Sequence, residues 1–187
     1  MAATAEMTRE LGWQAEDFEL EGVDGRRYRL SEIKGRNGTL VMFICNHCPY
    51  VQAVADDIAR DAKELEAEGV ASIAIMSNDT EAYPADSFEN MKAFARAHNF
   101  GFPYVIDRTQ EVARAYGAVC TPDFFGFDKD LRLRYRGRIQ EMRGTKPVPG
   151  ARRELLEAMR QIARTGTAPE DQNPSIGCSI KWRREPS

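Results

Sequence analysis

Two cysteines three positions apart are the residues best suited to chemistry in this chain. Cys45 and Cys48 enclose Asn46 and His47, between an apolar run and a stretch with helical spacing. A C-x-x-C in that position is typical of thiol–disulfide exchange, because the N-terminus of a helix favours a thiolate. We expect the Cys45 thiolate to attack and Cys48 to resolve the mixed disulfide.

His47 is a candidate for tuning this pair. An imidazolium near the Cys45 sulfur would favour the thiolate and make the pair more oxidising. Pro49 follows directly and suits the first turn of a helix, where its missing N–H would be unpaired anyway.

The same side chains allow an interpretation of another class, a metal-binding or metal-delivery module. Cys45, Cys48 and His47 offer soft ligands, and Cys120 could add another. A closed structural zinc site usually has four ligands, often as two separated pairs, and the sequence has no second C-x-x-C. Bound metal in protein purified without chelator would favour this interpretation.

Two further cysteines are candidate accessory thiols. Cys120 immediately precedes Thr121 and Pro122, and it also fits a small buried residue at a sheet edge. Cys178 lies in a tail rich in turn residues. It could resolve a disulfide if the tail folds over the cysteine pair; otherwise the tail only anchors itself through its apolar residues.

The elements around the pair are predicted from hydrophobic spacing. Apolar runs predict buried strands at 39–44 and 70–76, with a third strand at 104–107. Helical spacing predicts helices from Pro49 to a stop at Gly69, after Asp86 or Ser87, at 110–116 and at about 151–163. Alternating strands and helices imply parallel pairing with right-handed crossovers.

Both ends of this alternating region are expected to carry hairpins. Strands at 17–20 and 27–30 predict a leading hairpin, and strands at 123–127 and 131–135 an antiparallel hairpin at a sheet edge. The arginines that alternate from 132 to 138 are expected on a solvated strand face.

The chain therefore reads as one α/β domain over 1–187, in which a central mixed sheet is flanked by helices. A β-hairpin extends its N-terminal side, the core covers about 16–165, and a C-terminal tail covers about 166–187.

Three separated segments carry a family resemblance. They are CNHCPYV from Cys45, CTPDFF from Cys120 and PSIGCSIKW from Pro174. Together they resemble the small peroxiredoxin-like proteins of the AhpC/TSA-related thioredoxin superfamily. The resemblance implies a thioredoxin-like fold in which Pro122 is cis and Thr121 and Pro122 form the substrate-contacting loop. Asn46 and Pro49 are then expected to contact the substrate as well.

Departures from the relatives separate two activities. Peroxiredoxins carry Pro-x-x-x-Thr/Ser-x-x-Cys, whereas here Met42 stands at the hydroxyl position and Gly38 at the proline position. Thiol–disulfide oxidoreductase activity is therefore the leading expectation, with peroxide reduction as the alternative. The expected partners are protein disulfides or peroxide, with a thioredoxin-like reductant. No dissociable cofactor is expected.

Composition excludes other classes of partner. The 187 residues are 42% hydrophobic and 29% charged, and 26 basic against 29 acidic residues give a net charge of −3. Such a chain has no overall positive field to recruit nucleic acid or an anionic membrane. The N-terminus lacks the pattern of a secretory signal, and no stretch approaches the ~20 apolar residues of a membrane span. We therefore expect a cytoplasmic protein.

Overall fold

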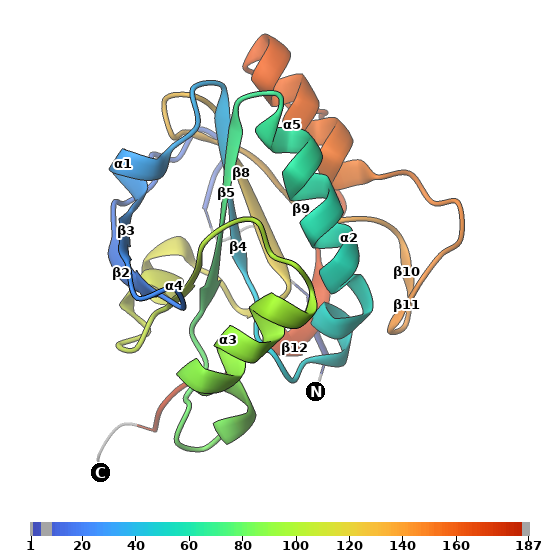
Figure 1. The fold of residues 1–187 in the computed structure, drawn as a ribbon. Coiled ribbons are helices and arrows are strands. Elements are labelled where there is room, and N and C mark those ends of the chain that lie inside the picture. Colours follow the sequence, from blue (N-terminus) through green and yellow to red (C-terminus); the bar gives the residue numbers. More distant parts are fainter. Residues whose placement is uncertain (1, 5–8, 185–187) are drawn as a thin grey trace.

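A seven-stranded mixed sheet forms the centre of the computed structural model, which describes residues 2–4 and 9–184 (Figure 1). In chain order the strands are β2 (Glu19–Gly22), β3 (Arg27–Arg29), β4 (Gly38–Phe43), β5 (Val70–Met76), β6 (Tyr104–Ile106), β8 (Asp123–Phe127) and β9 (Leu133–Gly137). Across the sheet their order is β3-β2-β6-β5-β4-β8-β9.

Strand β4 lies inside this sheet and leads to the cysteine pair. All six of its residues are buried, as expected of a continuous apolar run with both faces covered. It pairs in parallel with β5 and antiparallel with β8, and β5 pairs in parallel with β6. The predicted parallel pairing and the edge hairpin of β8 and β9 are both confirmed.

Helices cover both faces of the sheet (Figure 1). The first face carries α2 (Pro49–Glu66), α3 (Phe88–Ala97) and α5 (Glu154–Thr165), and the second carries α1 (Leu30–Ile33) and α4 (Glu111–Tyr116). The apolar side chains of alternate strand residues enter the two cores, Met42 on the first face and Phe43 on the second. The expected fold class is thereby confirmed.

The predicted N-terminal hairpin is present but is part of the main sheet. β2 and β3 pair antiparallel, and β2 also pairs with β6. β2 begins at Glu19 rather than Asp17, because the Asp17 carboxylate accepts hydrogen bonds from Phe18 and Ser31 instead of continuing a strand.

The C-terminal tail forms a strand that sequence analysis did not predict. A small antiparallel sheet joins β1 (Ala2–Thr4), β12 (Ile176–Ser179) and β7 (Cys120–Thr121) in the order β1-β12-β7. The tail therefore folds back onto the residues before Pro122. A separate two-stranded sheet pairs β10 (Met142–Arg143) with β11 (Lys146–Pro147).

The prediction of a solvated arginine face is wrong for Arg136. Its side chain is 2% exposed and pairs with the buried Asp123 at 2.8 Å. The pairing of β8 with β9 shifts register between Gly126 and Phe127, so the strand does not keep a simple alternation. Arg134 and Arg138 remain partly exposed and pair with other carboxylates.

Helix ends also differ from the predicted positions by a few residues. α5 begins at Glu154, after a turn in which Gly150 has a φ of +73°. α2 ends at Glu66, ahead of the predicted stop at Gly69. Within the described part of the chain, no helix has the length and apolar character that crossing a bilayer requires.

Candidate active site

The cysteine pair lies where β4 passes into α2. Cys45 follows two residues after the end of β4, and Cys48 is the N-cap of α2. The Cys48 carbonyl accepts the first helical hydrogen bonds, from the N–H groups of Val51 at 3.1 Å and Gln52 at 2.9 Å. Both cysteines are 0% exposed, whereas Pro49 is exposed at the rim.

The loop before β8 faces both cysteines. The Thr121–Pro122 peptide is cis, which confirms the expectation from the family resemblance. The Cys45 sulfur lies 3.4 Å from the Thr121 hydroxyl, and the Cys48 thiol, when protonated, donates to the Thr121 carbonyl at 3.3 Å. Thr121 and Pro122 are both buried, because β12 covers them.

The pKa values of the two thiols shift in opposite directions. The pKa of Cys48 is lowered to about 5, chiefly because the Cys45 thiol donates a hydrogen bond to it; burial opposes this, and the thiol of Cys178 supports it. The same hydrogen bond, with burial and the nearby Asp86 carboxylate, raises the pKa of Cys45. The lower pKa of the two belongs to Cys48, the N-cap of α2, and the attack by a Cys45 thiolate stays a prediction.

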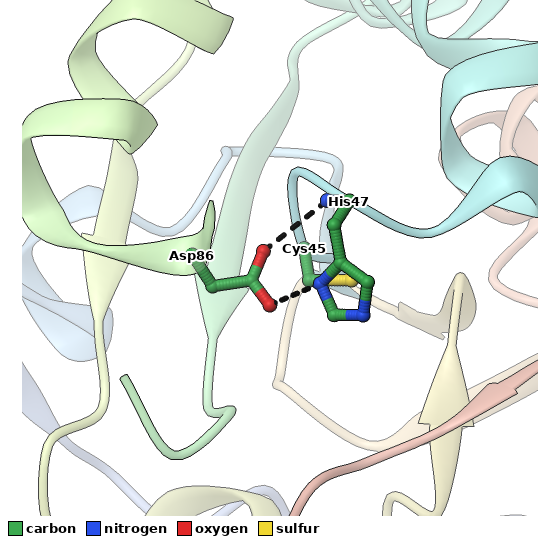
Figure 2. Close-up of side chains that lie close together, drawn as sticks. All are labelled: Cys45, His47 and Asp86. Atoms are coloured by element: carbon green, nitrogen blue, oxygen red, sulfur yellow. Dashed lines mark hydrogen bonds and ion pairs between the residues drawn. The ribbon is translucent and has the colours of Figure 1, made fainter. Parts of the chain in front are cut away.

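A buried carboxylate that sequence analysis missed organises the loop. Asp86 ends a short 3₁₀ turn (Pro84–Asp86) and is 0% exposed. It accepts hydrogen bonds from the backbone N–H of Asn46 at 2.8 Å and of His47 at 3.2 Å, and from the Asn78 side chain at 3.0 Å. Asp86 also contacts Nδ1 of His47 (Figure 2). The sequence signalled this residue only as a possible helix cap.

His47 is held in place from two sides. Besides its contact with Asp86, its ring stacks on Tyr83 with 5.6 Å between centroids and an interplanar angle of 11°. Figure 2 shows the other ring nitrogen turned away from Asp86. Asp86 therefore fixes the orientation of the imidazole beside the Cys45 sulfur.

The predicted metal ligands lie only partly together as a donor set. One donor atom each of Cys45, His47 and Asp86 lies within 4.8 Å of the others. Both carboxylate oxygens of Asp86 already accept hydrogen bonds, and the nearest nitrogen of His47 faces that carboxylate. The metal interpretation stays a prediction.

The placement of Asn46 differs from the predicted substrate contact. Its side chain is buried, donating to the Ala85 carbonyl at 3.1 Å and accepting from the Tyr104 hydroxyl at 2.8 Å. Its carbonyl accepts from Gln52 at 2.9 Å. Asn46 therefore anchors the loop to the sheet and to the turn of Asp86.

The two accessory thiols have different surroundings. Cys120 is fully buried, and burial raises its pKa; its sulfur lies 3.8 Å from the Pro122 carbonyl oxygen, which fits a structural residue. Cys178 is partly exposed and packs against the core cluster that contains Cys45 and Cys48. Burial, and then a hydrogen bond with Cys48, raises the pKa of Cys178 to about 11.

Sequence comparisons relate this chain to thiol enzymes. A family model described as AhpC/TSA family matches residues 11–136. A thiol-disulfide oxidoreductase ResA from Bacillus thuringiensis is 26% identical over 162 residues, covering 85% of this chain and 82% of the relative. A peroxiredoxin Bcp from Bacillus subtilis is 32% identical over 131 residues, covering 70% of this chain and 74% of the relative.

Solved structures support the same fold. A conserved protein from Geobacillus kaustophilus is 45% identical with a TM-score of 0.93, over 100% of this chain and 98% of that one. A thioredoxin-family thiol:disulfide interchange protein from Chlorobium tepidum is 18% identical with a TM-score of 0.60, over 84% of this chain and 97% of that one. The second likeness shows the fold alone, which is thioredoxin-like.

Proposed function

The chain belongs to the AhpC/TSA family, and from that membership we propose that it is a thiol–disulfide oxidoreductase whose Cys45 and Cys48 alternate between dithiol and disulfide. The observation that carries this proposal is the contact of the two thiols at the N-terminus of α2, beside the cis Thr121–Pro122 peptide. The ResA relative, named for the same reaction, supports it.

The protonation of the pair assigns an order to the reaction. In the proposed order Cys48 attacks first, because its pKa is the lower of the two. Its sulfur attacks a disulfide, and one thiolate leaves. Cys45 then attacks the Cys48 sulfur, and its proton passes to the second leaving thiolate. The pair ends as the Cys45–Cys48 disulfide, and the substrate ends as two thiols.

A redox titration tests this proposal. The protein is equilibrated in glutathione buffers, quenched with acid, alkylated and analysed by peptide mass spectrometry. We expect one reversible two-electron transition that produces the Cys45–Cys48 disulfide, and loss of insulin reduction in both Cys45→Ser and Cys48→Ser. Cys120→Ser is the control, because its buried thiol lies 3.8 Å from the Pro122 carbonyl oxygen and takes no part in the proposed exchange. Absence of a reversible transition would refute the oxidoreductase.

Peroxide reduction is the second candidate, favoured by the likeness to the peroxiredoxin Bcp. The Thr121 hydroxyl, 3.4 Å from the Cys45 sulfur, supplies a group that could orient a peroxide. One cysteine would become a sulfenic acid, and the other would capture it as a disulfide with release of water. The second-order rate constant with hydrogen peroxide decides: a value far above that of a free thiol indicates a peroxidase.

We also propose a thioredoxin-like dithiol as the reductant of the pair and the cytoplasm as its compartment. Four cysteines without a disulfide framework suit a reducing compartment. Thiol labelling after cell fractionation tests the location, and turnover with purified thioredoxin and its reductase tests the reductant.

A further inference from the structure

The strand β12 separates the cysteine pair from solvent and carries a thiol of its own. Cys178 pairs with Thr121 across the β12–β7 ladder, and Gly177 packs so closely that a Cβ there would lie 1.8 Å from the Thr121 carbonyl oxygen. Cys45 and Cys48 are 0% exposed beneath this cover, while Cys178 is partly exposed. Of these three cysteines, the one on β12 is the one that is not fully buried.

Cys178 and Cys48 contact each other across this cover. The thiols of Cys48 and Cys178 shift each other's pKa, and Cys178 packs against the core cluster that holds the pair. Cys48 in turn contacts Cys45. The three sulfurs therefore form a chain from the partly exposed Cys178, through Cys48, to the innermost Cys45.

Contacts on both sides of Cys178 hold this arrangement. Before it, the Ser175 hydroxyl donates to the Pro122 carbonyl at 2.6 Å. After it, the Ile180 N–H donates to the Val119 carbonyl at 2.9 Å, and the Lys181 N–H donates to the Asn78 side chain at 2.8 Å. The position of Cys178 over Cys48 is thus built into the fold.

We propose that Cys178 is a third redox thiol, which passes disulfides between external thiol or disulfide partners and the buried Cys45–Cys48 pair. This role rests on the proposed oxidoreductase function. It supplies a route by which external partners exchange disulfides with a cysteine pair that is fully buried.

The exchange balances at each step. The Cys178 sulfur attacks an external disulfide, passes its proton to the first external thiolate, which leaves as a thiol, and forms a mixed disulfide. Cys48 attacks the Cys178 sulfur, forms a Cys48–Cys178 disulfide and releases the second external thiolate. Cys45 then attacks the Cys48 sulfur, and its proton moves to the Cys178 thiolate that leaves. One external disulfide becomes two thiols, and two protein thiols become one disulfide.

The pKa values of the thiols favour the opposite direction of transfer, from a protein disulfide to external thiols. An external thiolate that meets the Cys48–Cys178 disulfide attacks the sulfur of the partly exposed Cys178, and Cys48 leaves. A thiol of low pKa is the better leaving group, and the pKa of Cys48 is lowered to about 5 while that of Cys178 is raised to about 11. Cys178 is thus suited to hand disulfides outward.

The first test looks for the internal disulfide in the full-length protein. Reduced protein is treated with oxidised glutathione, quenched with acid, alkylated with iodoacetamide and digested with trypsin. Cys45 and Cys48 fall in the peptide 37–60, and Cys178 falls in 165–181. We expect a cross-link between these peptides at early times in the wild type, and its accumulation in Cys45→Ser, which lacks the last step.

The second test measures the rate at which oxidised glutathione converts the reduced pair to the Cys45–Cys48 disulfide. In Cys178→Ser we expect this rate to fall by at least about tenfold, because the buried sulfurs lose their entry thiol. Cys120→Ser is the matched control and should keep the wild-type rate. Circular dichroism confirms that each variant is folded.

The outcomes separate the two proposals. A Cys45–Cys48 disulfide that forms at the wild-type rate in Cys178→Ser, without any cross-link in Cys45→Ser, overturns the role of Cys178 and leaves the oxidoreductase intact. If neither the wild type nor Cys178→Ser forms a reversible Cys45–Cys48 disulfide, the proposed oxidoreductase function itself is refuted. A cross-link between the peptides 37–60 and 165–181, together with slower formation of the Cys45–Cys48 disulfide in Cys178→Ser, supports both proposals.

Discussion

At the scale of single residues, the charge at the site depends on one thiol donating to another. The Cys45 thiol lowers the pKa of Cys48 to about 5, and burial with Asp86 keeps Cys45 itself protonated. The reactive sulfur is thus defined by a neighbouring side chain as well as by the helix N-terminus.

Replacing that donor should move the titration of Cys48. In the wild type, thiolate ultraviolet absorbance should appear as the pH rises through about 5. In Cys45→Ser we expect the midpoint to rise, because a serine hydroxyl reaches less far than a thiol and donates a longer hydrogen bond. Cys48→Ser identifies the signal by removing it. An unchanged midpoint in Cys45→Ser would show that the helix N-terminus alone stabilises the thiolate.

Asp86 should be the most sensitive polar residue around the pair. In Asp86→Asn, an amide N–H₂ must meet the donors of His47 or Asn78, which leaves buried groups unpaired. We expect a loss of about 1–3 kcal/mol in the free energy of unfolding. Slower disulfide exchange should accompany it. Denaturant titration measures the first effect, with the exposed Glu89→Gln as control; equal stabilities in the two variants would contradict the assigned role.

At the scale of elements, strand β12 controls access to the site. Gly177→Ala places a methyl group against the Thr121 carbonyl and should push β12 away from β7. Alkylation of reduced Cys48 by iodoacetamide should then be faster than in the wild type.

Gly101→Ala is the control for this variant, because a Cβ at Gly101 meets nothing within 4 Å. If iodoacetamide alkylates Cys48 at the same rate in Gly177→Ala and Gly101→Ala, β12 is not the element that limits access to Cys48. The comparison needs only the reduced proteins and one alkylation rate for each.

The hairpin of β8 and β9 contains a buried ion pair that should matter for stability. Arg136→Met leaves the Asp123 carboxylate buried without its 2.8 Å partner, a change that typically costs about 3–5 kcal/mol. Arg134→Met, which removes a partly exposed partner of Asp128, should cost at most about 1 kcal/mol. Denaturant unfolding compares them, and similar losses would contradict the distinction.

The predictable elements are those whose signals lie within one segment. β4, α2 and β5 follow from continuous apolar runs and helical spacing, and the C-x-x-C follows from its place between them. Asp86, by contrast, meets His47 at a sequence separation of 39 positions, and Arg136 meets Asp123 in a hairpin whose register shifts between Gly126 and Phe127. β12 is paired with residues far away in the chain and has no alternating pattern of its own.

At the scale of the whole molecule, stability should be distributed unevenly around the site. β4 is buried along its full length between two strands, whereas β12 pairs with the short strands β1 and β7. We expect amide hydrogen exchange to be slower in 38–43 than in 176–179, because small edge sheets open without global unfolding. Equal protection in the two segments would show that β12 unfolds only with the core.

The pairing of β1 with β12 has a practical meaning for anyone who handles this protein. Anything joined ahead of Ala2, whether an affinity tag, a fluorescent reporter or a natural extension, enters the molecule beside the strand that carries Cys178 (Figure 1). Such an addition can block incoming partners sterically or displace β12. Kinetic constants should therefore be compared between cleaved and uncleaved preparations before they are attributed to the enzyme.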